Sequence, residues 1–312
     1  MTVLVMNALA APLVQQRLPG WVQPRFFRSV EELLQLAPEA EIGWFDLNDK
    51  DQMARAIRSA THLKWLNSIY AGVDAMPLDL LRERGVVLTN GVGINAITIA
   101  EYVVMGMLTV AKGYREVVRA QERHEWLLDS PGKVELAGSR ALLLGYGAIG
   151  QRVDRMLQGF DVDVVKVRRS EGEGTLGPDA WRSQLGSFDW VILAVPSTPE
   201  TVGMIGEAEI AAMKPGATLV NVARGEVVDQ DALIAGLKAG RPGHAFLDVT
   251  TPEPLPAAHP LWSLPNAHVT SHLSGRAQTR MFERSVARFL ENLDRFGRGE
   301  PLQPQVDLIR GY

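Results

Sequence analysis

The sequence of 312 residues contains no cysteine. This absence excludes disulfide bonds, thiolate nucleophiles and zinc sites built on cysteine, and we predict no metal site of any kind. An excess of charge of one sign is also missing. The 32 Lys and Arg residues against 36 Asp and Glu leave a net charge of −4, which argues against nucleic acid as a partner.

Long hydrophobic runs are missing as well. The longest apolar stretch, residues 96–111, is interrupted by Glu101 and is too short to span a membrane. The N-terminal residues are apolar but no positively charged segment precedes them, so they read better as a strand and a helix than as a signal peptide. We therefore expect no membrane partner and a cytoplasmic location.

The composition that remains is that of a globular protein, with 46% hydrophobic and 22% charged residues. The length suggests two domains. Short apolar runs alternate with helical patterns, which is typical of a parallel α/β architecture. The predicted strands are residues 2–6, 41–45, 63–69 and 86–89, and then 141–144, 162–167, 190–195, 218–222, 245–249 and 268–270. The helices predicted in the first part are residues 30–36, 52–60 and 78–84.

Two further helical patterns set the predicted domain boundaries. Residues 97–120 read as one long apolar helix, and residues 277–296 read as one amphipathic helix that ends at Gly297. One helix leaves the first sheet and the other returns to it, so the first domain is discontinuous. The predicted fold is two Rossmann-like or flavodoxin-like parallel-sheet domains joined by hinge helices, formed by residues 1–94 with 277–312 and by residues 95–276.

A G-x-G-x-x-G motif, residues 145–150, lies between a predicted strand and a predicted helix. In that setting the first glycine permits a tight turn, the second leaves room for a pyrophosphate, and the third lets the helix pack on the strand. An ordinary strand–turn–helix corner is the alternative. The context favours a dinucleotide site formed by Gly145, Tyr146, Gly147, Ala148, Ile149 and Gly150.

The strand after this motif does not end in an acidic residue. Arg168, Arg169 and Ser170 stand where an Asp or Glu normally binds the adenosine ribose. Two guanidinium groups and a hydroxyl suit a 2′-phosphate, so NADPH is the preferred cofactor and NADH remains possible. The alternative is a solvated basic loop, neutralised by Glu171 and Glu173.

Three later strands end in polar segments: NVARGEVVD from Asn221, LDVTTPEPL from Leu247 and VTSHLSG from Val269. The carboxyl edge of an open parallel sheet is where ligands bind. Each of these segments contains a residue that, taken singly, has a purely structural interpretation. Arg224 could be a surface ion-pair partner, Glu253 a solvated loop acid and His272 a structural histidine. Their occurrence together at one edge favours a reaction site.

The ordered combination of the glycine motif, LAVPSTPET, NVARGEVVD, PEPLP and SHLSG resembles the D-isomer-specific 2-hydroxyacid dehydrogenase family over essentially the whole chain. Within that family, the C-terminal QVDLIRGY and the basic segment at Arg168 look most like the bacterial glyoxylate/hydroxypyruvate reductase A type. The resemblance implies that the discontinuous domain binds substrate and that residues 95–276 bind nucleotide.

The resemblance also implies roles for individual residues. Arg224 would bind the substrate carboxylate and polarise the keto oxygen, His272 would be the acid–base, and Glu253 would be its carboxylate partner. The chemistry agrees, because hydride delivery to a 2-keto carbon builds negative charge on the oxygen and requires a cation and a proton donor. The other residues assigned to the cofactor are Val195, Pro196, Thr201, Val222, Ala223, Asp248 and Ser274. Those assigned to the substrate are Trp44, Tyr70, Ala71, Gly72 and Asn95.

The predicted function is reduction of a small 2-keto acid by NADPH, with glyoxylate or hydroxypyruvate implied by the resemblance. The domains would close about a hinge near Asn95 and Gly275, and a homodimer is expected. Larger aryl or branched 2-keto acids and a nucleotide-sensing co-repressor are the alternatives. The family's pattern is not followed at Ser271, where proline is usual, or at Thr250 and Thr251, where an aromatic is frequent. Glu253 argues against formate as substrate, because formate dehydrogenases carry glutamine beside the histidine.

Overall fold

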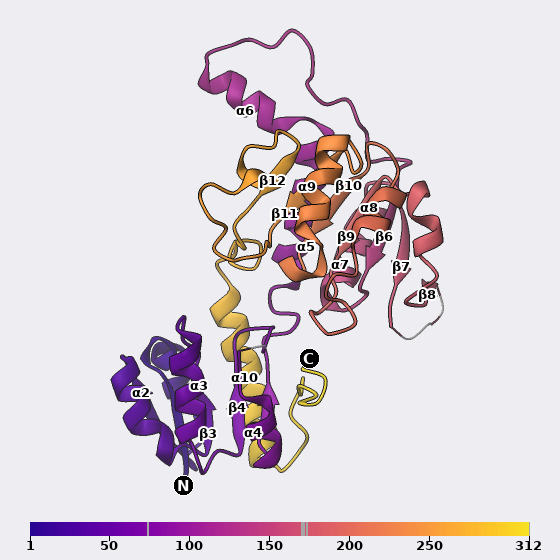
Figure 1. Cartoon of the computed structure of the whole chain (residues 1–312). Coiled ribbons are helices and arrows are strands. Elements are labelled where there is room, and N and C mark those ends of the chain that lie inside the picture. The colour runs from indigo at the N-terminus through magenta and orange to yellow at the C-terminus, as the bar shows by residue number, and fades with distance from the viewer. Residues whose placement is uncertain (74, 170–171, 173, 312) are drawn as a thin grey trace. The chain divides into compact units, whose positions relative to one another are not determined.

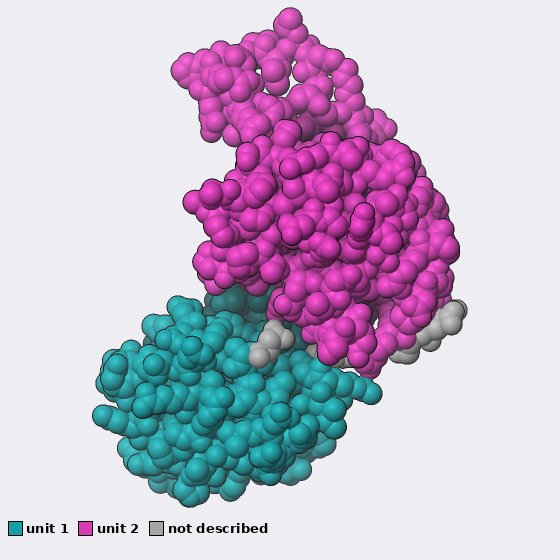
Figure 2. Space-filling model, viewed as in Figure 1, with its two compact units in different colours: residues 1–95, 278–312 teal, residues 96–277 magenta. Residues whose placement is uncertain are grey.

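The computed structural model describes residues 1–73, 75–169, 172 and 174–311. The chain divides into two compact units: unit 1 is Met1–Asn95 with Gln278–Tyr312, and unit 2 is Ala96–Ala277. Figure 2 colours the two units separately. Unit 1 is discontinuous in sequence, and both changes of unit fall one residue beyond the predicted boundaries.

Unit 1 is built on a five-stranded parallel sheet with the order β2-β1-β3-β4-β5. This is the flavodoxin-like order. The strands are β1 (Thr2–Asn7), β2 (Val22–Phe27), β3 (Ile42–Trp44), β4 (Trp65–Asn67) and β5 (Val87–Thr89). The helices are α1 (Ala11–Val14), α2 (Val30–Leu36), α3 (Lys50–Ser59), α4 (Leu78–Glu83) and α10 (Met281–Gly297).

Helices cover both faces of this sheet, and successive strand residues point to opposite faces, so both sets of side chains are buried. Val5 packs with residues of α2, α3 and α4, whereas its neighbours Leu4 and Met6 pack with residues of α1 and α10. Helix α10 therefore belongs to unit 1 although it follows unit 2 in the sequence (Figure 1).

Unit 2 is built on a seven-stranded parallel sheet with the order β12-β11-β10-β9-β6-β7-β8. The strands are β6 (Arg140–Leu144), β7 (Asp163–Val167), β8 (Thr175–Leu176), β9 (Trp190–Leu193), β10 (Thr218–Asn221), β11 (His244–Leu247) and β12 (Ala267–Val269). The helices are α5 (Ala96–Ala111), α6 (Tyr114–Glu122), α7 (Ala148–Gln158), α8 (Glu207–Ala212) and α9 (Gln230–Ala239). The strand order reverses between β6 and β9, the point at which doubly wound sheets bind their ligands.

The same alternation buries both faces of the second sheet. Leu142 and Leu144 pack with residues of α8 and α9, and Ala141 and Leu143 pack with residues of α5 and α7. The predicted fold class, two parallel-sheet α/β domains with the first one discontinuous, is confirmed.

Strand β2 was not predicted. Its sequence, VQPRFF, contains Pro24 and Arg25, which break the pattern of a buried strand. The strand lies at the edge of its sheet, beside β1 alone, and an edge strand tolerates a proline and a charge because one side of its backbone needs no partner.

The single helix predicted over residues 97–120 is wrong. Helix α5 ends at Ala111, and α6 starts after Gly113, whose φ of +60° is left-handed. The two helices are bent by 70°, so α6 and the segment after it extend from the body of unit 2 (Figure 1). Among the described residues no single helix is long and apolar enough to cross a membrane, and only this bent pair would pass as a candidate.

Candidate active site

The turn between β6 and α7 carries the glycine motif. Gly145 has a φ of +102°, and a Cβ on it would lie 2.4 Å from the carbonyl oxygen of Ala194. A Cβ on Gly150 would lie 2.2 Å from the carbonyl oxygen of Gly145, whereas one on Gly147 would meet nothing within 4 Å. Gly145 and Gly150 are therefore required for the close packing of the turn, whereas Gly147 leaves open space beside it.

Helix α7 begins beneath that space with no side-chain cap on its N-terminus. Its first backbone N–H groups, at Ala148 and Ile149, carry the positive end of the helix dipole, which suits an anion. The side chain of Tyr146 is not part of this surface, because its hydroxyl donates a hydrogen bond of 2.7 Å to Asp154. That bond raises the pKa of Tyr146.

Exposed positive charge follows β7. Arg168 and Arg169 are both exposed, and the backbone N–H of Arg168 is held by Leu176 of β8 at 3.1 Å. Glu200 has a lowered pKa because Thr198 donates a hydrogen bond to it, and the charge of Arg169 adds to this effect. The third residue of the predicted basic segment, Ser170, lies outside the described residues. The arginines, the open α7 terminus and the space above Gly147 together fit a phosphorylated dinucleotide.

The residues that follow β9 lie at the reversal of strand order, opposite the glycine turn. They include Val195, which is partly exposed, and Pro196, which is exposed. The hydroxyl of Thr201 donates to the carbonyl oxygen of Pro196 at 2.7 Å and accepts the N–H of Thr198 at 2.8 Å. Thr201 therefore shapes this loop from within.

The loop after β10 is shaped by Asn221, whose side chain is almost fully buried. Its amide nitrogen donates to the carbonyl oxygen of Arg224 at 2.9 Å, and its amide oxygen accepts the N–H of Ala223 at 3.0 Å. The guanidinium of Arg224 donates to the carbonyl oxygen of Ala223 at 2.8 Å. Val222 and Ala223 are buried, so Asn221 turns the chain and brings Arg224 to the strand end.

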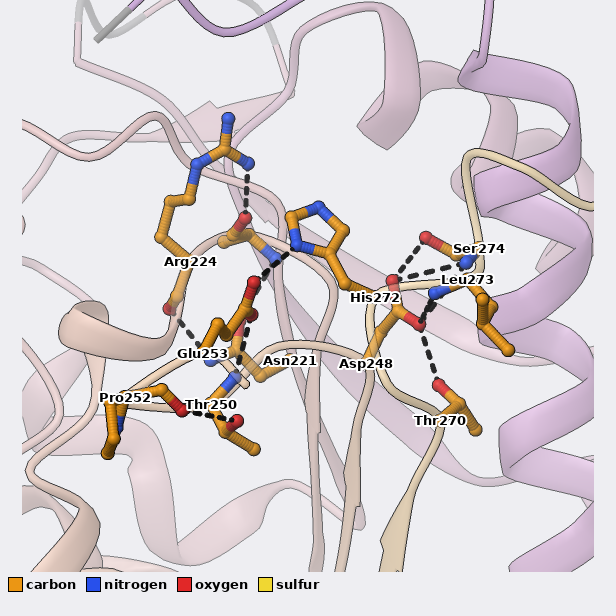
Figure 3. A network of polar contacts seen from close by, with 11 residues as sticks. Asn221, Arg224, Asp248, Thr250, Pro252, Glu253, Thr270, His272, Leu273 and Ser274 are labelled. Atoms are coloured by element: carbon orange, nitrogen blue, oxygen red, sulfur yellow. Dashed lines mark hydrogen bonds and ion pairs between the residues drawn. The ribbon is translucent and has the colours of Figure 1, made fainter. Parts of the chain in front are cut away.

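Glu253 and His272 come from the loops after β11 and β12 and meet at the same sheet edge. Nδ1 of His272 lies 2.7 Å from Oε2 of Glu253, and the side chains are 47% and 38% exposed. The other carboxylate oxygen accepts the N–H of Thr250 at 3.1 Å. Figure 3 shows the pair at the ends of neighbouring strands, with Nε2 of the imidazole turned away from Glu253. Nε2 is thus the nitrogen open to a substrate.

Asp248 organises the loop that carries His272. This carboxylate is 1% exposed and accepts hydrogen bonds from the Thr270 hydroxyl at 2.7 Å, the Leu273 N–H at 3.0 Å and both the N–H and hydroxyl of Ser274. The N–H of His272 donates to the carbonyl oxygen of Asp248 at 2.6 Å. Asp248 and Ser274 were predicted at the cofactor, and here their side chains hold the histidine loop together (Figure 3).

The histidine loop adopts an uncommon backbone. Ser271 and His272 have φ values of +52° and +56°, in the left-handed region. Such conformations cost free energy in residues other than glycine and persist where the surroundings impose them. Proline, the residue usual in the family at position 271, has its φ locked near −65° and cannot adopt this one.

In unit 1 the loop after β4 carries the predicted substrate-binding backbone. Its N–H groups are used in order: Ser68 donates to Thr89 at 2.9 Å, Ile69 to the Asp46 carboxylate at 2.6 Å, and Tyr70 to the Ser68 hydroxyl at 3.1 Å. For Ala71 and Gly72 no described residue accepts the N–H hydrogen. These two N–H groups are therefore available to an anion, whereas that of Tyr70 is already engaged.

The two remaining predicted substrate residues, Trp44 and Asn95, make contacts of their own outside the backbone of this loop. Trp44 is 4% exposed and packs against Phe282 and Phe289 in the core of unit 1. The amide oxygen of Asn95 accepts a hydrogen bond of 2.7 Å from Gln278, which joins the last residue of the first segment of unit 1 to the first residue of the second.

Sequence reasoning did not identify Asn221 and Thr270 as site residues. Asn221 ends β10 and Thr270 follows β12, so both had the signal of a polar residue at the sheet edge. Their function is to shape loops through hydrogen bonds, and only the tertiary structure shows which groups are the partners in those bonds. Among the residues that the structure describes, no group of three or more His, Asp or Glu side chains is arranged to hold a metal ion.

Comparison with known proteins shows the family of the chain. The family model "D-isomer specific 2-hydroxyacid dehydrogenase, NAD binding domain" matches residues 104–274. A glyoxylate reductase of Pyrococcus furiosus is 34% identical over 258 residues, which cover 78% of this chain and 75% of that protein. A D-3-phosphoglycerate dehydrogenase of Archaeoglobus fulgidus is 31% identical over 287 residues, which cover 90% of this chain. The chain spans about half the length of that relative, 54%.

A solved structure covers the whole chain. It is a D-isomer specific 2-hydroxyacid dehydrogenase from Xanthobacter autotrophicus in complex with NADPH and MES, and it is 29% identical with a TM-score of 0.80. The match covers 100% of this chain and 99% of that one.

Proposed function

The chain belongs to the D-isomer specific 2-hydroxyacid dehydrogenase family, and we propose that it uses NADPH to reduce a small 2-keto acid, glyoxylate or hydroxypyruvate, to the 2-hydroxy acid. The observation that carries this proposal is the contact between Nδ1 of His272 and Glu253, on the sheet edge that also holds Arg224 and the glycine turn. A binding protein would have no need of a carboxylate-oriented imidazole with its second nitrogen open.

The residues at this edge divide the chemistry among them. When bound, the reduced nicotinamide supplies the hydride that the keto carbon accepts. His272 donates a proton from Nε2 to the keto oxygen, and Glu253 orients the ring through Nδ1. Arg224 binds the substrate carboxylate and stabilises the charge that develops on the oxygen. Asp248 and the backbone of Val222 and Ala223 remain the proposed ligands of the carboxamide.

The loop after β4 in unit 1 offers N–H donors of its own that suit a carboxylate. The N–H groups of Ala71 and Gly72 have no acceptor among the described residues, and successive N–H groups of this kind form anion sites. Such contacts are made equally to ground state and transition state, so we expect them to affect KM more than kcat.

NADPH is proposed over NADH because Arg168 and Arg169 occupy the end of β7. Guanidinium groups bind phosphate with charge-assisted hydrogen bonds, and the acidic residue that would repel a 2′-phosphate is absent from this position. The Xanthobacter autotrophicus relative in complex with NADPH supports the assignment. NADH is the alternative cofactor.

A homodimer is proposed from the surface of α5, α6 and the segment that follows them. Apolar side chains are exposed there, with Trp126 at 90%, Leu128 at 97% and Tyr114 at 57%. Val104, Met105 and Leu108 of α5 line a cavity of about 610 Å³ on the same surface. Exposed apolar side chains together with an apolar cavity favour contact with a second copy of the chain.

The test is NADPH oxidation followed at 25 °C with glyoxylate, hydroxypyruvate, phenylpyruvate and a branched 2-keto acid. We expect the highest kcat/KM with glyoxylate or hydroxypyruvate. A preference for phenylpyruvate or the branched acid would move the assignment to a larger substrate. Tight NADPH binding with no turnover of any of the four acids would contradict the enzyme proposal and favour a nucleotide sensor.

A further inference from the structure

Asp46 is a carboxylate that the chemistry proposed above does not use. It follows β3 and accepts three hydrogen bonds: from the Trp44 indole at 2.7 Å, the Ser68 hydroxyl at 2.6 Å and the Ile69 N–H at 2.6 Å. Two of these donors belong to the loop after β4. The carboxylate therefore joins two neighbouring strand ends of unit 1.

The loop after β4 depends on these bonds for its shape. The Ser68 hydroxyl that donates to Asp46 also accepts the N–H of Tyr70 at 3.1 Å. Asp46 thus fixes one N–H group directly and the next one through a single hydroxyl. The two residues after Tyr70 are Ala71 and Gly72, whose N–H groups have no acceptor in the described part of the chain.

The carbonyl groups of the loop are held by the segment that follows the neighbouring strand β5. The Tyr70 oxygen accepts the Gly91 N–H at 2.8 Å, and the Ala71 oxygen accepts the Asn90 amide at 2.7 Å. With both carbonyls engaged, the peptide planes at Ala71 and Gly72 have little freedom to rotate. Each of these carbonyls shares a planar peptide unit with the next N–H, so the same bonds fix the orientations of the Ala71 and Gly72 N–H groups.

The environment of Asp46 shows that its burial is costly and that other charges offset the cost only in part. Desolvation raises the pKa of Asp46 despite its hydrogen bonds and the nearby charge of Lys50. The Lys50 ammonium lies 3.2 Å from the centre of the Tyr70 ring and donates to the Leu47 oxygen at 3.2 Å. Hydrophobic packing would stabilise the fold at lower cost than a partly buried carboxylate, so the presence of Asp46 argues for a positional role.

We propose that Asp46 is a positioning residue for substrate binding: through Ile69 and Ser68 it aligns the Ala71 and Gly72 N–H groups for the carboxylate of the 2-keto acid. This inference rests on the proposed function, since it assumes that the loop binds a carboxylate. Asp46 itself touches no reacting atom. Its contribution is to order a loop before substrate arrives, so that binding does not have to supply the ordering.

The test is a graded series at this carboxylate. Asp46→Asn keeps one acceptor oxygen, Asp46→Ala keeps none, and Ser68→Ala removes only the relay to Tyr70. We expect KM for glyoxylate to rise about three- to tenfold in Asp46→Asn and Ser68→Ala, and by more than about tenfold in Asp46→Ala, with kcat within about threefold of wild type. The inhibition constant for oxalate, which binds by its carboxylates and is not reduced, should rise in parallel.

Thr89→Val is the matched control. The Thr89 hydroxyl is buried one strand away, where it accepts the Trp65 indole N–H and donates to Asn67, and it makes no bond to the loop. This variant should lower the melting temperature and leave the KM for glyoxylate and the oxalate constant unchanged. A parallel rise in Thr89→Val would reduce Asp46 to a general stabiliser of unit 1.

The outcomes separate this inference from the proposed function. A wild-type protein that turns over 2-keto acids, with unchanged KM and oxalate constant in folded Asp46→Asn and Ser68→Ala, would overturn the positioning role alone. A wild-type protein that neither reduces a 2-keto acid nor binds oxalate would overturn both. If Asp46→Ala does not fold, the asparagine and serine variants still decide.

Discussion

At the residue scale, the proposed reaction depends on one nitrogen of His272. Its Nδ1 is held by Glu253, which leaves Nε2 as the proton donor. His272→Ala should therefore lower kcat by about 10²- to 10⁴-fold, the usual contribution of general acid–base catalysis. NADPH affinity, measured by quenching of protein fluorescence, should stay within about twofold because the imidazole is not part of the glycine turn. A large loss of NADPH binding would show that the fall in kcat comes from a disturbed loop and not from the missing proton donor.

Arg168 tests the cofactor assignment at the same scale. It is exposed at the end of β7, so changing it removes no buried contact. Arg168→Asp places a negative charge where the 2′-phosphate is proposed to bind, and we expect kcat/KM for NADPH to fall at least about tenfold while that for NADH changes little. Arg152→Asp, on the exposed side of α7, is the control for a general charge effect. Equal losses with both cofactors would contradict the proposed discrimination.

At the scale of elements, the glycine turn offers two substitutions with opposite expected outcomes. Gly150→Ala forces a Cβ against the Gly145 carbonyl oxygen, so we expect a loss of about 1–3 kcal/mol in the free energy of unfolding. Gly147→Ala meets open space and should unfold at the same denaturant concentration as wild type. It should nevertheless raise the KM for NADPH about tenfold, because the methyl group occupies the approach of the pyrophosphate. Unchanged NADPH binding in Gly147→Ala would place the phosphates elsewhere.

Strand β12 carries His268, a titratable histidine that has no part in the proposed reaction. Burial lowers the pKa of His268 to about 4, with smaller contributions from the charges of Arg115 and His244. The folded state thus holds a neutral ring that the unfolded chain protonates below its ordinary value of 6.5. Stability is therefore lost as the pH falls from about 6.5 towards about 4.

His268→Gln should remove part of that acid sensitivity. The expected loss in wild type between pH 7 and pH 4.5 is on the order of 1–2 kcal/mol, after allowance for solvent screening. Urea unfolding at the two pH values measures it, with His62→Gln, an exposed position in unit 1, as control. An identical pH dependence in His268→Gln and wild type would assign the effect to other groups.

At the scale of the whole molecule, the exposed apolar segment after α6 predicts association. Trp126 and Leu128 are among the most exposed apolar side chains of the chain. We expect wild type to sediment as a dimer at micromolar concentration and the double variant Trp126→Asp with Leu128→Asp to sediment as a monomer. Each large apolar side chain contributes roughly 1.5–3 kcal/mol when fully buried, so losing two should raise the dissociation constant by more than about 100-fold. Exposed Leu9→Asp in unit 1 is the control.

The sequence alone was enough to predict the alternation of strands and helices, the position of the glycine motif and the discontinuous first domain. Each of these depends on local periodicity or on the order of motifs along the chain. Strand β2 was missed because Pro24 and Arg25 are acceptable only at a sheet edge, and edge position is a property of the sheet. The break at Gly113 was missed because apolar periodicity continues across it.

At the site, residue types and spacing were sufficient to nominate Arg224, Glu253 and His272. The tertiary structure decided which imidazole nitrogen meets the carboxylate, and it showed that Asn221, Asp248 and Asp46 each shape a loop. These roles escape the sequence because a hydrogen bond between strand ends joins residues that are far apart in the chain. Local pattern sets what each strand end carries, and only the packing of the strands decides which groups meet there.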